Sequence, residues 1–179
     1  MSKGWIAALA LLGMVTVANA DKWAAPTPRV YAAPGGAYGF KTVPAENFGG
    51  PAVGTLFSLD KTGNEKVIWA AKLVNVPHRV YVADSGKRIA TVDTHGGLGF
   101  QHVVVLYDEK GKALADFKLE DLFTADEIAK HAPATVSSRH WAGEAAFKFD
   151  ENAGQFVVTL KWGKVVRIAL ESGKVLDGK

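Results

Sequence analysis

Apolar and polar residues alternate with a period of two along much of the chain, and turn residues separate the alternating segments. Between residues 78 and 119, alternating segments lie on both sides of a turn at 84–87. The apolar run 103–107 is typical of a strand buried on both faces, and residues 112–118 alternate again. This stretch therefore predicts four short antiparallel strands joined by turns.

The same unit recurs upstream and downstream. The segment that begins at Arg29 matches the one that begins at Arg79 in its opening residues and its turn, and residues 146–160 form a looser third copy. The hairpin that closes each unit also recurs, with turn glycines Gly63, Gly111 and Gly173, where positive φ is needed. Hairpins often resemble one another by chance, but here both halves of the unit recur in the same order. We therefore expect three repeats, at about 29–73, 79–119 and 141–176.

Four antiparallel strands in about forty residues is the size of one β-propeller blade. In this pattern residues 29–176 resemble the blades of WD40-like and related β-propeller proteins, although the Gly-His and Trp-Asp dipeptides of WD40 blades are absent from these positions. The resemblance implies an all-β fold of about three four-stranded antiparallel propeller-like blades, a partial or half propeller. It transfers no functional residues to this chain.

One segment, about 120–140, interrupts the repeats with a helical pattern. Thr124 and Glu127 have the spacing of a capping box, in which each side chain accepts a hydrogen bond from the other residue's backbone N–H. Apolar residues at 122, 123 and 128 supply a stripe for packing. We expect one short helical insertion, which either covers exposed sheet edges or acts as a lid.

The N-terminal residues 1–20 have the features of a signal peptide. Lys3 precedes an apolar run, and Ala18-Asn-Ala20 provides the small residues of a cleavage site. The alternatives are a buried first helix and a membrane anchor, but an apolar run of this length is short for a bilayer span. We expect cleavage after Ala20, a single β-repeat domain over 21–179 without a transmembrane anchor, and a periplasmic or extracellular location.

Charge and cysteine content narrow the function classes. Removal of Lys3 lowers the formal net charge from +3 to +2, and so weak an excess argues against a nucleic-acid partner. The chain has no cysteine, which excludes disulfides, thiol catalysis and cysteine-ligated metals. An exported protein without disulfides is more typical of bacteria than of small eukaryotic secreted modules.

The candidate ligand-binding residues lie on one face of the predicted repeats. Arg29 and Arg79 occupy the same position in two repeats, and Arg139 lies near the corresponding position of the third. Convergence of three guanidinium groups would create an anion site, whereas local pairing with carboxylates or carbonyls is the alternative for each. All five histidines fall in loops on or beside this face. Their grouping is a second reason to expect a site there, and the alternative is that they are ordinary surface residues. The ligand-binding hypothesis comprises Arg29, Arg79, Arg139, His78, His140 and Trp141.

A metal site is the alternative use of the same face. His95 and His102 flank a glycine-rich loop and approach each other if the two adjoining strands pair. With Asp93, or alternatively with His78, they would offer nitrogen and oxygen ligands to a divalent ion such as zinc. The spacing matches no established metal motif, so structural histidines are the competing interpretation and no cofactor is the leading expectation.

The function expected from these observations is that of an exported, non-enzymatic binding module whose partner is a protein or a small anionic ligand. The alternative is a metal-assisted hydrolase or lactonase-like enzyme that uses the histidine-rich face. Three sheets are too few to close a ring, so we expect a homodimer that brings together six repeats. The alternative is a monomer whose open ends are capped by the helical insertion and the N-terminal segment.

Overall fold

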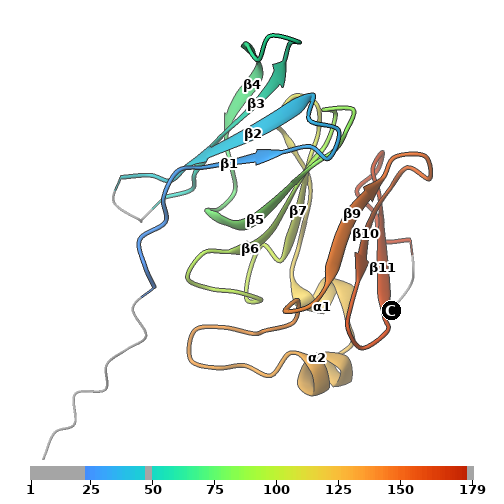
Figure 1. Cartoon of the computed structure of the whole chain (residues 1–179). Helices are drawn as coiled ribbons and strands as arrows, with labels where there is room; N and C mark the ends of the chain where they lie inside the picture. The colour runs from blue at the N-terminus through green and yellow to red at the C-terminus, as the bar shows by residue number, and fades with distance from the viewer. Residues whose placement is uncertain (1–22, 47–49, 177–179) are drawn as a thin grey trace, which may run out of the picture.

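The structure, a computed structural model, describes residues 23–46 and 50–176. The predicted signal peptide and its cleavage site lie outside these residues. The described chain is mainly β-structure, arranged as three antiparallel sheets with two short helices at one end (Figure 1). Neither of these helices has the length and apolar character required to cross a membrane.

The first two sheets each contain four strands in sequence order, as the alternation predicts. Neighbouring strands pair antiparallel throughout, and the register between the third and fourth strands shifts at Leu56 and Phe57, where Ile68 of the fourth strand is the extra residue. The first sheet consists of β1 (Arg29–Ala32), β2 (Tyr38–Val43), β3 (Val53–Leu59) and β4 (Glu65–Lys72). The second consists of β5 (Pro77–Val82), β6 (Ile89–Thr94), β7 (Val104–Tyr107) and β8 (Ala113–Phe117).

The third sheet corrects the expectation of three four-stranded units. It has only three strands, β9 (Ala146–Asp150), β10 (Gln155–Thr159) and β11 (Val165–Ala169). The expected fourth strand at 174–176 is reduced to a single bridge between Ile168 and Val175. The tight turn at Gly173 does return the chain, since Leu176 N–H donates to the Arg167 carbonyl at 2.8 Å, but the pairing goes no further among the described residues.

The insertion also differs from the single helix expected. It forms two helices, α1 (Leu119–Leu122) and α2 (Ala125–His131). The predicted capping box explains the break: Thr124 is extended, its hydroxyl accepts the Glu127 N–H at 3.3 Å, and the Glu127 carboxylate accepts the Thr124 N–H at 2.9 Å. A residue that caps one helix cannot at the same time continue the preceding one.

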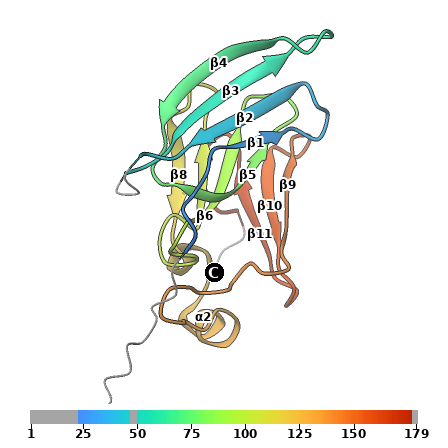
Figure 2. The same cartoon turned by 60° about the vertical axis from the view of Figure 1, so that its left-hand side comes forward.

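Two apolar clusters hold the sheets together. In the first, Phe40, Leu56 and Trp69 of the first sheet pack against side chains of the second. In the second, Phe156 of the third sheet packs with residues of the second sheet and of both helices. Figure 2 shows the sheets at an angle to one another. The first strand of each sheet contacts the first strand of the next, β1 against β5 and β5 against β9. The helices pack against apolar side chains of the second and third sheets. The described sheets do not close into a ring.

Successive sheets are also linked through equivalent turns. The N–H of Gly35, in the β1–β2 turn, donates to the Asp84 carboxylate in the β5–β6 turn at 2.6 Å. The N–H of Ser85, in that second turn, donates to the Glu151 carboxylate in the β9–β10 turn at 3.1 Å. An equivalent contact thus joins both pairs of neighbouring sheets. Pro34 stands where the other turns have an acid, so the first turn has no such acceptor.

Candidate functional site

A pocket of about 230 Å³ lies between the second sheet and the loop that leads from α2 to β9. β5 contributes an imidazole and a guanidinium group, β6 contributes a carboxylate, and most of the other lining residues belong to the loop. We call it the arginine pocket, and its principal lining residues are His78, Arg79, Asp93, Arg139, His140 and Gly143.

Asp93 anchors the floor of the arginine pocket. It is only 2% exposed and has a positive φ of 59°, a conformation that Asp tolerates better than most residues. Its Oδ1 accepts the Trp141 Nε1–H at 2.8 Å and the Gly99 N–H at 2.9 Å. Burial raises the pKa of the Asp93 carboxyl group, and these two donors together with Arg79 oppose that rise. Asp93 thereby ties the glycine-rich loop and the α2–β9 loop to the sheet.

Arg79 is held in place from three sides but keeps donor capacity. Its Nη1 and Nη2 both donate to the Ala142 carbonyl at 3.3 Å, and Nη2 lies 3.6 Å from Asp93 Oδ2. The guanidinium carbon lies 4.8 Å from the centre of the Phe147 ring, within cation–π range. The side chain is 30% exposed, and its buried Nε has no hydrogen-bond partner among the described residues.

Arg139 reaches the same pocket from the α2–β9 loop. Its backbone N–H donates to the Leu98 carbonyl at 2.8 Å, which fixes the loop against the glycine-rich segment. Its Nη1 lies 3.6 Å from the carboxylate of Glu120, which is itself 63% exposed, and an exposed pair at that distance contributes little. The Arg139 side chain is 27% exposed, and its Nε is likewise buried without a hydrogen-bond partner among the described residues.

His78 adjusts the charge of the pocket. Burial, reinforced by the neighbouring Arg79, lowers the pKa of the His78 imidazole, so the neutral form is favoured near pH 7. Two guanidinium groups and one buried carboxylate are then the fixed charges of the lining. The chemistry available to this arrangement is electrostatic and hydrogen-bonded recognition of an anion.

The structure brings together four of the six predicted ligand-binding residues. Arg79, Arg139, His78 and His140 line the arginine pocket, although the two arginines come from segments sixty residues apart. Trp141 is 5% exposed and supports the pocket through Asp93 rather than lining it. Arg29 is exposed on β1 and does not belong to the lining, although it is near enough to contribute to the lowered pKa of His78.

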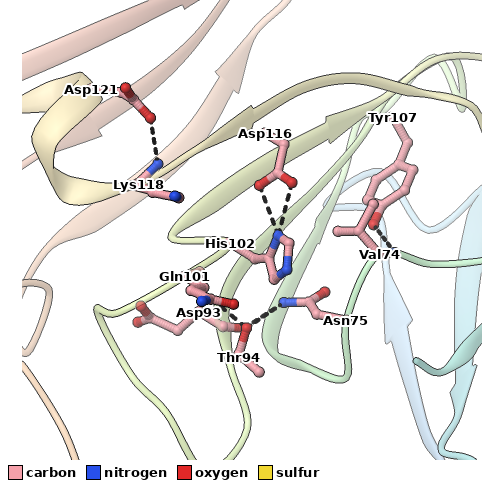
Figure 3. A network of polar contacts seen from close by, with 10 residues as sticks. All are labelled: Val74, Asn75, Asp93, Thr94, Gln101, His102, Tyr107, Asp116, Lys118 and Asp121. Carbon is pink, nitrogen blue, oxygen red and sulfur yellow. Dashed lines mark hydrogen bonds and ion pairs between the residues drawn. The ribbon is translucent and has the colours of Figure 1, made fainter. Parts of the chain in front are cut away.

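The three candidate metal ligands are engaged separately. His95 Nε2 lies 2.8 Å from the Ala24 carbonyl, under the N-terminal segment, where Trp23 packs edge-on against its ring. Figure 3 shows His102 turned towards the Asp116 carboxylate, at 2.8 Å, with the Asp93 side chain pointing away from it. Over residues 23–46 and 50–176, no three His, Asp or Glu side chains are grouped so as to hold a metal ion.

Several residues of the site have no signal in the sequence. The Ala142 carbonyl, the Phe100 ring near Arg139 and the carboxylate of Glu120 contact the two arginines from distant segments. The structure shows how these segments come together, because Gly99, with a φ of 72°, lets its loop approach another backbone closely. A Cβ at Gly99 would lie 2.5 Å from the Arg139 carbonyl oxygen, so that close approach does occur.

Comparison with known proteins adds no family to these observations. The chain matches no protein-family model, and it matches no curated protein.

Proposed function

We propose that this protein is an exported, non-enzymatic binding module of propeller-like architecture that holds a small anion in the arginine pocket. The observation that carries the proposal is the pair Arg79 and Arg139, two half-buried arginine side chains that line one pocket of about 230 Å³. A half-buried guanidinium group has lost part of its hydration, so donors without a partner carry a free-energy cost. A carboxylate or phosphate group between them would accept donors that the protein itself leaves unused.

The composition of the lining favours binding over catalysis. Asp93 is engaged by Trp141, Gly99 and Arg79, so it acts as a structural anchor and not as a free base. For the metal-assisted hydrolase that the sequence also allowed, the described residues offer no shared centre of His and Asp side chains. A small anion, held by charge and hydrogen bonds, remains the ligand class that fits these groups best.

The first test removes one guanidinium from the pocket. Arg139→Gln is expected to weaken the binding of acetate and inorganic phosphate about tenfold or more, because charged hydrogen bonds are lost while the backbone contact to Leu98 is kept. Isothermal titration calorimetry at low ionic strength measures the affinity. Lys61→Gln, in the exposed turn between β3 and β4, removes the same charge far from the pocket and should have little effect. Unchanged binding in Arg139→Gln, or equal loss in both variants, would contradict the proposal.

Export is tested separately. The Ala18-Asn-Ala20 site predicts that the mature protein begins at Asp21. N-terminal sequencing or intact mass of protein expressed in a bacterial host, with the periplasmic and cytoplasmic fractions compared, measures this. Full-length chain that keeps residues 1–20 in the exported fraction would contradict cleavage, and protein confined to the cytoplasm would contradict export.

A further inference from the structure

A second pocket, of about 350 Å³, adjoins the arginine pocket. The two share His140 and Gly143 in their linings, so they lie next to each other along the α2–β9 loop, and together we call them the groove. We call the second pocket the ring pocket, and its principal lining residues are Lys130, His131, Trp141, Glu144, Lys161 and Trp162.

The ring pocket contains a flat aromatic surface. The imidazole of His131 lies parallel to the indole of Trp162, with ring centres 4.3 Å apart and 2° between their planes. Phe123 supports the indole from another side at 5.7 Å. Both His131 and Trp162 are half-buried, so the stack is anchored in the protein while part of it faces the pocket. A stack of this kind offers a platform on which a second ring can lie.

The charges of the ring pocket are of both signs. Lys130, in the last turn of α2, and Lys161 are exposed cations, and the exposed carboxylate of Glu144 pairs with Lys161 at 2.5 Å. Exposed pairs contribute little and exchange readily with other partners. Carboxylate oxygens accept hydrogen bonds from hydroxyl groups but repel phosphates, and ammonium groups attract carboxylates. The lining therefore suits a molecule with many hydroxyl groups and widely spaced negative charges.

We infer that the groove binds an acidic oligosaccharide, a short chain of sugar rings that carry carboxylate groups. The inference rests on the proposed anion-binding function, because one carboxylate would lie in the arginine pocket between Arg79 and Arg139. A neighbouring sugar ring would lie against the His131–Trp162 stack, with its hydroxyl groups near Glu144 and its carboxylate near Lys130. A densely charged polyanion is a poorer match, since Asp93 and Glu144 both lie along the groove.

Calorimetry with three probes tests the inference: acetate, a trimer of galacturonic acid, and the neutral trimer maltotriose. The acidic trimer is expected to bind at least tenfold more tightly than either other probe. Lys130→Gln should weaken the acidic trimer several-fold and leave acetate unchanged, because Lys130 lines only the ring pocket. Lys61→Gln serves again as the matched control for loss of charge.

Gly143 provides a test at the junction of the two pockets. Its backbone does not have a positive φ, and a Cβ there would meet no atom within 4 Å, so a side chain is tolerated. Gly143→Glu places a carboxylate between the two pockets and should reduce binding of the acidic trimer at least tenfold. Circular dichroism and thermal unfolding establish that this variant keeps the fold.

The outcomes separate the two proposals. Acetate binding that depends on Arg139, without tighter binding of the acidic trimer, overturns the oligosaccharide inference and leaves the anion site standing. Absence of any probe binding overturns both. Tighter binding of inorganic polyphosphate or of a trinucleotide than of the acidic trimer also overturns the inference, because it would identify a general polyanion site.

Discussion

Replacement of Asp93 by alanine is expected to lower the free energy of unfolding by about 3–5 kcal/mol, the usual cost of removing one partner of a buried charged network. The change leaves the Trp141 Nε1–H and the Gly99 N–H without their acceptor and separates Arg79 from its carboxylate. Alanine also tolerates the φ of 59° less well than aspartate. Urea denaturation followed by fluorescence and by circular dichroism measures the loss.

Asp93→Asn is the matched control. Its side-chain oxygen can still accept from Trp141 and Gly99, and Asn tolerates positive φ, so we expect stability to change by no more than about 1 kcal/mol. If alanine and asparagine are equally destabilising, the ionic contact dominates and the hydrogen-bond network does not. If neither variant loses stability, the anchoring role assigned to Asp93 is wrong.

The difference in stability between the wild type and Asp93→Asn should depend on pH. Burial raises the pKa of Asp93 in the folded state above the ordinary value of 3.8. At a pH between 3.8 and the raised pKa of the folded state, Asp93 holds a proton in the folded chain and has lost it in the unfolded chain. The free energy of unfolding that Asp93 contributes therefore falls as pH rises through this range. Asp93→Asn cannot titrate. The stability difference, wild type minus Asp93→Asn, should therefore decrease from pH 3.8 upwards and level off above the folded pKa.

Gly111→Ala is expected to lower the free energy of unfolding by about 2–4 kcal/mol, the sum of a left-handed backbone cost and an overpacking cost. Gly111 has a φ of 78° in the β7–β8 turn, and a Cβ there would lie 2.6 Å from the Trp69 ring. Trp69 is buried and packs against Phe40, with ring centres 5.4 Å apart, so it cannot move away freely. Chemical denaturation measures the loss.

Gly63→Ala separates the two contributions. Gly63 occupies the equivalent turn of the first sheet with a φ of 86°, but a Cβ there would meet nothing within 4 Å. It should cost only the backbone term, about 1–2 kcal/mol. Equal losses in the two variants would show that Trp69 yields to the added methyl group and that the packing between the first two sheets is looser than the structure indicates.

Local features of the sequence determined most of the β-structure. The period-two alternation located the strands of the first two sheets, and the turn glycines Gly63, Gly111 and Gly173 all have positive φ as predicted. The capping box at Thr124 is also confirmed. These features depend on residues a few positions apart, whose conformational preferences act within one hairpin or one helical turn. The homodimer, the propeller-like classification and the export of the protein stay predictions.

The number of strands in the third sheet was decided by interactions that alternation does not report. Residues 174–176 resemble the closing strand of the other repeats, yet only Val175 forms a bridge with β11. A Cβ at Gly173 would lie 2.9 Å from Ala115, so this turn packs tightly against β8 of the neighbouring sheet. The repeat in sequence therefore predicted the turn, and it contained no information about the contact of that turn with a neighbouring sheet.

The candidate site belongs almost entirely to the tertiary structure. From the sequence, Arg79, Arg139, His78 and His140 could be assigned to one face, but not to one pocket. Arg29, equally well placed in the repeat, lies outside it. Asp93, considered a metal ligand, is instead the buried acceptor that joins two loops to the sheet. The contact between Asp93 and Trp141 joins residues 48 positions apart, and its geometry depends on how distant segments pack together. A pattern with a period of two residues specifies which side of a strand a residue faces, and it contains no information about what lies opposite.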